Sequence, residues 1–298
     1  MEAPLCLPFD PAPAQPRHRL PLGATDCHCH VFMDTSHYPM LRERSYTPAP
    51  AALEQYVRMC EIVGLARTVQ VSASVYGFDN SLTLDVIRIL GKHRARGVAA
   101  VRPGTGRQEL RGLYEAGMRG VRLSTTVKGY GGTELMQQLA AAVSPFGMHL
   151  QLHLRKVAEL ADLEPELMCT PAPLVFDHMG GVLGAEGVDC AGFQALLRIL
   201  RARDDCWVKI SSWYRRSDSG GPDFADMAPI VQALVETRAD RLLFGTNWPH
   251  PALFASQADR VPNDGHLVDQ FCDWVPDERV RELILVANPS RLYGFEDL

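Results

Sequence analysis

The feature that most constrains the fold is an alternation of short apolar runs with longer amphipathic stretches, repeated eight times along the chain. The short runs have the length and aliphatic content of buried strands, and the stretches between them place apolar residues at helical spacing. Strands are therefore predicted at 24–32, 68–73, 97–102, 120–124, 149–154, 173–178, 206–211 and 241–246, and helices at 51–64, 80–95, 107–116, 133–143, 155–168, 191–202, 224–237 and 277–286.

This order of elements indicates the α/β class. Strands that alternate with helices build parallel sheets, and eight such units in roughly 275 residues match the size of one closed (β/α)8 TIM barrel. An open doubly wound sheet would carry a glycine-rich phosphate turn after its first strand, and no such turn follows residues 24–32. Residues 1–23 contain six prolines and are predicted to form an extended arm, so the barrel domain is assigned to 24–298.

Charge and cysteine content exclude several classes of function. A formal net charge of -5 gives no dominant positive field for nucleic acid. No apolar run reaches the roughly 18 residues that a membrane span needs, and the amino end lacks the pattern of a secretory signal. The eight cysteines form no CxxC pair and are expected to be reduced. We therefore expect a cytoplasmic protein without membrane or nucleic-acid partners.

Histidines gather where the predicted strands end. His28 and His30 lie on the first strand, His153 ends the fifth and His178 ends the sixth. Because the carboxyl ends of barrel strands face one pocket, these four imidazoles are expected to converge. Strand alternation predicts that His28 and His30 share a face with Asp26, with Cys27 on the other face. Imidazoles in such a site can bind a metal, hydrogen-bond a carbonyl oxygen or transfer protons.

The motifs TDCHCHVF, VFDHMGG, GTNWPHP and NPSRLYGF resemble those of the amidohydrolase-related family grouped with 2-pyrone-4,6-dicarboxylate lactonase, from about residue 24 to the end. The resemblance implies an amidohydrolase-like barrel. Ordinary amidohydrolases hold divalent metals through a strand-one HxH pair, a strand-four lysine, two further histidines and a strand-eight aspartate. The lactonase branch is thought to work without metal, with histidines and arginines holding the lactone and the aspartate activating water.

Two positions depart from this pattern. The strand-eight aspartate is replaced by Asn247, and the strand-four stretch GVRLS contains no lysine. An amide cannot take a proton from water near neutral pH. Three neutral imidazoles, those of His28, His30 and His178, can hold zinc. The loss of the other ligands nevertheless favours a site without metal or other cofactor.

Ten residues are candidates for the site. The resemblance assigns Tyr46, Ser74, Arg122 and Arg215 to contacts with substrate carboxylate and ring oxygens, a role that suits the planar guanidinium group. His250 follows Asn247 and is expected to reach the same pocket. The predicted catalytic residues are His28, His30, His153, His178 and Asn247, and the predicted substrate-binding residues are Tyr46, Ser74, Arg122, Arg215 and His250.

The leading hypothesis is a hydrolase of the ester ring of a small, carboxylated lactone. The imidazoles would donate to the carbonyl oxygen, and His153, His178 or His250 would activate water in place of the missing aspartate. Because an internal hydroxyl can attack more readily than water, an isomerase of a sugar-acid lactone is the main alternative. A metal-dependent decarboxylase and a ligand-binding relative without catalysis remain further alternatives. The expected partner is a small anionic lactone, derived from an aromatic or a sugar acid, and a monomer and a homodimer are equally compatible with the sequence.

Overall fold

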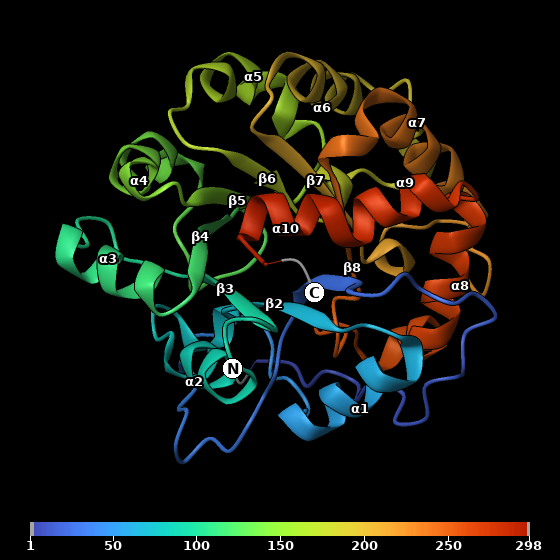
Figure 1. Cartoon of the computed structure of the whole chain (residues 1–298), viewed down its shortest axis with the longest axis horizontal. Helices are drawn as coiled ribbons and strands as arrows, with labels where there is room; N and C mark the ends of the chain where they lie inside the picture. The colour runs from blue at the N-terminus through green and yellow to red at the C-terminus, as the bar shows by residue number, and fades with distance from the viewer. Residues whose placement is uncertain (1–2, 297–298) are drawn as a thin grey trace.

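A closed parallel barrel forms the centre of the molecule. The computed structural model describes residues 3–296, in which eight strands pair in the order of the sequence. The last strand lies beside the first, where the Asn247 backbone N–H donates to the His28 carbonyl at 2.7 Å. This confirms the predicted (β/α)8 TIM barrel (Figure 1). The strands are β1 Thr25–Cys29, β2 Arg67–Val71, β3 Ala95–Ala99, β4 Met118–Ser124, β5 His149–His153, β6 Leu174–Phe176, β7 Cys206–Ser211 and β8 Leu242–Gly245.

Helices surround the barrel, and each predicted helical stretch contains one. They are α1 Leu53–Val63, α2 Ser81–Leu90, α3 Arg107–Glu115, α4 Met136–Val143, α5 Glu159–Cys169, α6 Ala191–Ala202, α7 Ala228–Arg238, α8 Asp264–Trp274, α9 Glu278–Glu282 and α10 Asn288–Tyr293. A π-helical segment, Leu283–Ala287, joins α9 to α10. The sequence analysis did not predict α8.

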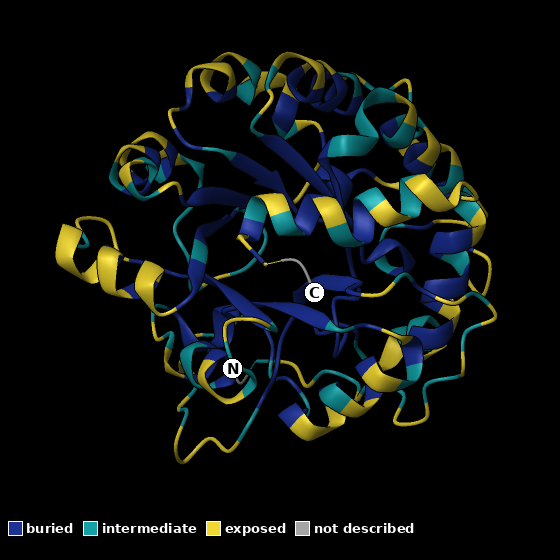
Figure 2. Cartoon of the chain, in the orientation of Figure 1, coloured by how far each residue is buried: buried dark blue, intermediate teal, exposed yellow. Residues whose placement is uncertain are grey.

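Burial follows the two layers of the fold. Every strand residue except Arg119 of β4 is buried, whereas the helices alternate between buried and exposed residues (Figure 2). Inside the barrel, Cys27, Val69, Val98, Val175 and Leu243 form a cluster with Tyr293 and Phe295 near the carboxyl end of the chain. Because α10 and Phe295 pack against the first residues of β2 and β3, they close the amino-terminal end of the barrel and leave the opposite end for a site.

A β-bulge in β1 overturns the predicted alternation. Asp26 pairs with Thr68 and Cys29 with Gln70, so β1 holds one extra residue between these pairs. As a result Cys27 points into the barrel, while the Asp26 carboxylate accepts a hydrogen bond from Tyr56 of α1. Asp26 and His28 therefore do not share a face. The bulge turns both Cys27 and His28 toward the barrel interior.

The arm runs in extended conformation beside α8. The Ala14 N–H donates to the Asn263 side chain at 2.8 Å, and the Arg17 N–H donates to Asp269 at the same distance. Residues 1–2 of the predicted arm and 297–298 of the predicted domain lie outside the described residues, and the boundary at residue 23 stays a prediction.

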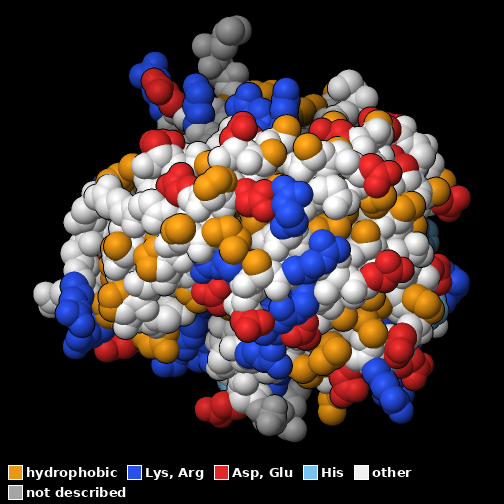
Figure 3. All heavy atoms as spheres, turned by 90° about the horizontal axis from the view of Figure 1, so that it is seen from above, with side chains coloured by type: hydrophobic (Ala, Val, Ile, Leu, Met, Phe, Trp, Pro, Cys, Tyr) orange, Lys and Arg blue, Asp and Glu red, His pale blue; other side chains and the backbone are white. Residues whose placement is uncertain are grey.

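The face of the molecule shown in Figure 3 is not dominated by charges of one sign. Basic and acidic side chains are interspersed over the face shown in Figure 3. Within residues 3–296, no helix combines the length and the apolar character that a membrane crossing requires.

Candidate active site

Four imidazoles form a continuous row at the carboxyl end of the barrel. The ring centroids are separated by 5.2 Å between His30 and His28, 4.7 Å between His28 and His178, and 5.2 Å between His178 and His153. All four side chains are buried. Strand ends from β1, β5 and β6 supply them, as the sequence predicts, and we call these four residues the histidine row.

A buried ionic cluster lies behind the histidine row. The Asp177 carboxylate accepts from His28 Nδ1 at 3.0 Å, from Arg122 Nε at 2.9 Å and from Gln151 Nε2 at 3.1 Å. Lys209 Nζ lies 3.6 Å from Asp177 and donates to Gln151 Oε1 at 2.7 Å. One carboxylate therefore ties residues of β1, β4, β5 and β7 to the end of β6.

Burial and charge act in opposite directions in this cluster. Burial alone would raise the pKa of Asp177, but His28, Arg122 and Lys209 outweigh it and hold that pKa well below its usual range. Burial lowers the pKa of His28 to about 3, against the opposing effect of Asp177. Burial also lowers the pKa of Lys209, although Asp177 favours its charged form. Asp177 is thus a carboxylate, and His28 is neutral before substrate binds.

The hydrogen bonds of β1 fix the tautomers of its two histidines. His30 Nδ1 lies 2.7 Å from the Val71 carbonyl oxygen, which can only accept, so this nitrogen carries the proton. His28 Nδ1 lies 3.0 Å from the Asp177 carboxylate, closer than the 3.4 Å that separates it from Lys209 Nζ, and it therefore carries a proton for Asp177. In their neutral forms both rings consequently present an unprotonated Nε2. His28 and His30 can therefore accept a proton through Nε2. This differs from the predicted role, in which both rings donate to a carbonyl oxygen.

The other two histidines take the opposite tautomer. The Ser124 hydroxyl accepts from two backbone N–H groups, which leaves its hydrogen for His153 Nδ1 at 3.2 Å. The buried Ser211 hydroxyl has no partner but His178 Nδ1, at 2.7 Å, within the described residues, so donation to that nitrogen satisfies it. His153 and His178 then carry their protons on Nε2. Within the histidine row, Nε2 of His153 and His178 can donate a hydrogen bond, and Nε2 of His28 and His30 can accept one.

Asn247 is held by residues from the loop after β7. Its Nδ2 lies 2.9 Å from the Tyr214 hydroxyl and 3.3 Å from Ser212 Oγ. The Tyr214 hydroxyl also lies 3.0 Å from His250 Nδ1, and His250 Nε2 lies 3.4 Å from Asp264. His250 is buried. Its backbone N–H donates to the Asn247 carbonyl at 2.7 Å, and its ring reaches the Asn247 side chain through Tyr214.

The predicted substrate-binding residues divide into two groups. Arg122 uses Nε and Nη2 for Asp177, and only Nη1 reaches another group, the Tyr130 hydroxyl at 3.4 Å. Burial raises the pKa of Tyr46, and its nearness to Ser74 and Arg122 opposes that rise. Ser74 is buried as well. These groups lie together near Arg122. Arg215 is half-buried on the loop after β7 and has no ion pair within residues 3–296.

The donor set does not fit a metal centre that includes the carboxylate. His28, Asp177 and His178 offer ligand atoms within 4.8 Å of one another. However, Asp177 already accepts hydrogen bonds from three side chains, one of them the cationic Arg122, and forms an ion pair with Lys209 at 3.6 Å. A divalent cation at this carboxylate would lie beside both charges, which opposes its binding. The remaining candidate ligands are imidazoles alone.

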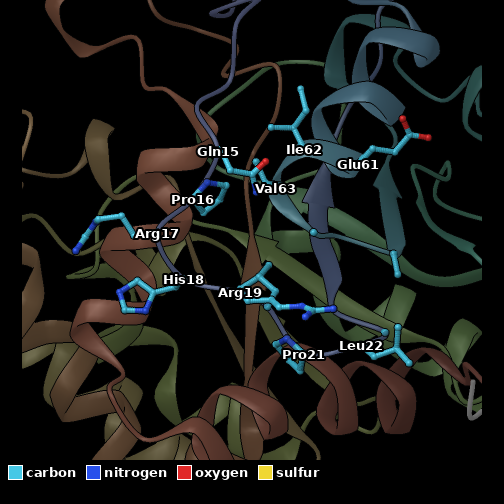
Figure 4. Close-up of a pocket in the computed structure, with 14 residues that line it drawn as sticks. Gln15, Pro16, Arg17, His18, Arg19, Pro21, Leu22, Glu61, Ile62 and Val63 are labelled. Carbon is cyan, nitrogen blue, oxygen red and sulfur yellow. The ribbon is translucent and has the colours of Figure 1, made fainter.

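A cavity of about 470 Å³ lies away from the histidine row. Residues 15–23 of the arm line it together with the end of α1 (Figure 4). Gly23 and Ala66 place it near the starts of β1 and β2, at the amino-terminal end of the barrel. Its lining includes none of the predicted site residues.

Sequence reasoning missed five residues around the site: Gln151, Asp177, Lys209, Tyr214 and Asp264. A signal for two of them was present. Asp177 directly precedes His178, and Lys209 interrupts the apolar run CWVKIS of a predicted buried strand. Because a buried charge needs a partner, this pair could have been sought from the sequence. Nothing in the sequence linked Asp264 to His250.

The chain is similar to known proteins along nearly its whole length. The chain is 34% identical to 2-pyrone-4,6-dicarboxylate hydrolase of Comamonas testosteroni, over 96% of this chain and 95% of that protein. It is 35% identical to 4-sulfomuconolactone hydrolase of Rhizobium radiobacter, over 92% and 91%. It is also 28% identical to D-galactarolactone isomerase of Agrobacterium fabrum, over 93% of each.

A solved structure shares the fold across its length. The apo crystal structure of an Agrobacterium tumefaciens protein superimposes with a TM-score of 0.85 at 26% identity, covering 95% of this chain and all of that one. The model of the amidohydrolase family matches residues 25–295, which include every strand of the barrel. The chain therefore belongs to the amidohydrolase family.

Proposed function

We propose that the protein hydrolyses the ester ring of a small, carboxylated lactone. The observation that carries this proposal is the division of the histidine row into two donors and two acceptors. Ester hydrolysis needs both, because negative charge develops on the carbonyl oxygen while the attacking water loses a proton. The names of the two hydrolase relatives, both of which refer to carboxylated or sulfonated ring substrates, support the same class of reaction.

In the proposed reaction, the Nε2–H groups of His153 and His178 hydrogen-bond the lactone carbonyl oxygen. A water oxygen attacks the carbonyl carbon, and His28 Nε2 takes its proton. The tetrahedral intermediate then breaks the ring C–O bond, and the imidazolium of His28 returns the proton to the departing alkoxide. The Asp177 carboxylate, 3.0 Å from His28 Nδ1, stabilises that imidazolium.

This assignment changes the predicted roles within the site. His28 replaces His153, His178 and His250 as the proposed base. No step passes through a metal ion, in line with the poor fit of Asp177 to a metal centre. Arg215, which has no ion pair within the described part of the chain, is the proposed partner of the substrate carboxylate.

Titration of acid release from a panel of lactones tests the proposal. Opening an ester ring yields a carboxylic acid, which releases one proton near neutral pH. We expect release with carboxylated lactones derived from aromatic or sugar acids and much slower release with uncharged lactones of the same ring. No release from any carboxylated lactone would refute the proposed hydrolysis.

A lactone isomerase is the second candidate. Asn247 stands where the resembled family has its aspartate, and one relative is named D-galactarolactone isomerase. With a substrate that carries its own hydroxyl, the same donors and acceptors would serve an internal attack. The product would then be a lactone of different ring size, formed without acid release and identified by NMR.

A further inference from the structure

Two residues outside the histidine row, His250 and Tyr214, connect Asp264 to Asn247. Asp264 begins α8, His250 lies in the loop after β8, and Tyr214 lies in the loop after β7. All three side chains are buried, as is Asn247. We call Asp264, His250 and Tyr214 the relay.

Each hydrogen bond along the relay has one direction. A carboxylate only accepts, so His250 Nε2, 3.4 Å from Asp264, carries the ring proton. His250 Nδ1 is then an acceptor, and the Tyr214 hydroxyl donates to it at 3.0 Å. The oxygen of Tyr214 is left to accept, and it takes the N–H of Asn247 Nδ2 at 2.9 Å. The charge on Asp264 thus determines which end of the Asn247 amide faces Tyr214.

The other end of that amide is an acceptor without a partner. Within residues 3–296 no donor lies at hydrogen-bond distance from Asn247 Oδ1, whereas Nδ2 has both Tyr214 and Ser212. The Asn247 backbone N–H bonds to the carbonyl of His28, so residue 247 adjoins the proposed base where the last strand meets the first. A carbonyl oxygen here can accept from the O–H of a water or of a substrate hydroxyl.

The backbone around the relay is strained. Asn247 and His250 have φ values of 60° and 61°, in the left-handed region. Asparagine tolerates this conformation better than histidine does, and such strain persists only where surrounding contacts impose it. Bonds from His250 to both Tyr214 and Asp264 are contacts of that kind.

We propose that the relay is a positioning device that keeps Asn247 Oδ1 turned toward the nucleophile of the reaction. This proposal rests on the proposed function. Asp264, His250 and Tyr214 act through Asn247 and are positioning residues. Position 247 then orients the attacking O–H group as an acceptor, while the proton itself goes to the histidine row.

A double-mutant comparison tests the proposal. The Asn247 amide presents a donor, Nδ2, and an acceptor, Oδ1, whereas an aspartate at this position presents two equivalent oxygens. Tyr214→Phe leaves the amide of Asn247 free to reverse, and we expect kcat to fall roughly 10- to 100-fold with KM little changed. In an Asn247→Asp background, where reversal makes no difference, the same substitution should lower kcat less than about threefold.

The matched control is Tyr293→Phe, which removes another buried hydroxyl, one without a partner at the opposite end of the barrel. Its kcat should equal that of the wild type. An equal loss from Tyr214→Phe in both backgrounds would show that Tyr214 only supports the fold, and the proposal would be overturned.

A second measurement tests the direction of the hydrogen bonds in the relay without an activity assay. In protein labelled with 15N-histidine, long-range 1H–15N NMR correlations report which ring nitrogen carries the proton, and His250→Gln identifies the signal of His250. We expect the signal of Nε2 to show a bound proton, because that nitrogen faces Asp264. Protonation on Nδ1 would refute the direction of the relay, whereas failure of the wild type to open any lactone would refute only the proposed function.

Discussion

Asp177 links more of the site than any residue named from the sequence. Its two oxygens accept hydrogen bonds from residues of three strands and form an ion pair with Lys209 of a fourth, and it lies against the proposed base. Breaking a buried ion pair by removing one partner is costly because the remaining charges stay buried. The same carboxylate therefore contributes to stability and to the proposed chemistry.

Asp177→Asn should damage both properties. We expect a loss of about 3–5 kcal/mol in the free energy of unfolding, because Arg122 and Lys209 lose their counter-charge. We expect kcat to fall roughly 10²- to 10⁴-fold, because His28 loses the group that stabilises its protonated form. Urea denaturation and lactone kinetics measure the two effects.

Glu164→Gln is the matched control for that substitution. It removes one partner of the ion pair between Glu164 and the exposed Arg198, and exposed pairs contribute about 0–1 kcal/mol. A comparable loss of stability in both variants would contradict the importance assigned to the buried cluster.

Arg215→Ala should separate substrates by charge. If Arg215 binds the substrate carboxylate, KM for a carboxylated lactone should rise about tenfold or more, since a hydrogen bond to a charged group contributes about 1.5–3 kcal/mol. KM for the methyl ester of the same lactone should hardly change. Arg155→Ala, an exposed arginine on the loop after β5, serves as control. Equal effects on acid and ester would contradict this role.

The sequence located the histidine row but not the direction of its hydrogen bonds. His28, His30, His153 and His178 could be placed because strand ends converge in a barrel. The tautomers of His30, His153 and His178 depend on hydrogen bonds with Val71, Ser124 and Ser211. Nothing in the sequence marks these three residues as hydrogen-bond partners of histidines. Those partners lie on neighbouring strands, so their contacts could not be inferred without the register of the barrel.

At the scale of elements, two features escaped prediction for local reasons. The bulge in β1 adds one residue between Asp26 and Cys29, and a periodic pattern cannot show an extra residue. Helix α8 begins after Pro262 in a loop-like sequence, and its buried positions include polar Asp264 and Asp269. Those polar positions obscured the helical pattern of apolar residues.

Asn263 joins the arm to α8. Its Oδ1 caps the helix by accepting from Gly265 N–H and also accepts from Ala14 N–H, while its Nδ2 donates to Asp10. Asn263→Ala should lower the free energy of unfolding by about 1–2 kcal/mol and loosen the arm. Denaturation and limited proteolysis of residues 1–23 measure these effects.

Asp277→Ala provides the comparison, because Asp277 caps α9 and holds no arm residue. It should lose stability without faster cleavage of the arm. Equal cleavage rates in wild type and Asn263→Ala would show that other contacts, such as those of Arg17 with Asp269, hold the arm by themselves.

For the whole molecule, the eight repeats of strand and helix were sufficient to predict the architecture. Each repeat hides its apolar face against the next, and no other closed arrangement fits eight parallel units of this length. The site then follows from the fold, because α10 and Phe295 cover one end of the barrel and the histidine row occupies the other.

The electrostatics of the site predict activity without metal. After dialysis against a chelator, with metal content verified by elemental analysis, we expect the rate of lactone opening to be unchanged. The reason is that Arg122 and Lys209 already neutralise Asp177 and oppose a further cation. Loss of activity on chelation with recovery on adding zinc would contradict this expectation.

If the histidine row directs water to a lactone carbonyl, the oxygen of that water enters the product, and oxygen-18 labelling detects it. The protein is incubated with a carboxylated lactone in H₂¹⁸O, and the opened product is analysed by mass spectrometry. We expect one ¹⁸O atom in the newly formed carboxylate after a single turnover. Turnover that gives a rearranged lactone without label would contradict hydrolysis and establish the internal attack of an isomerase.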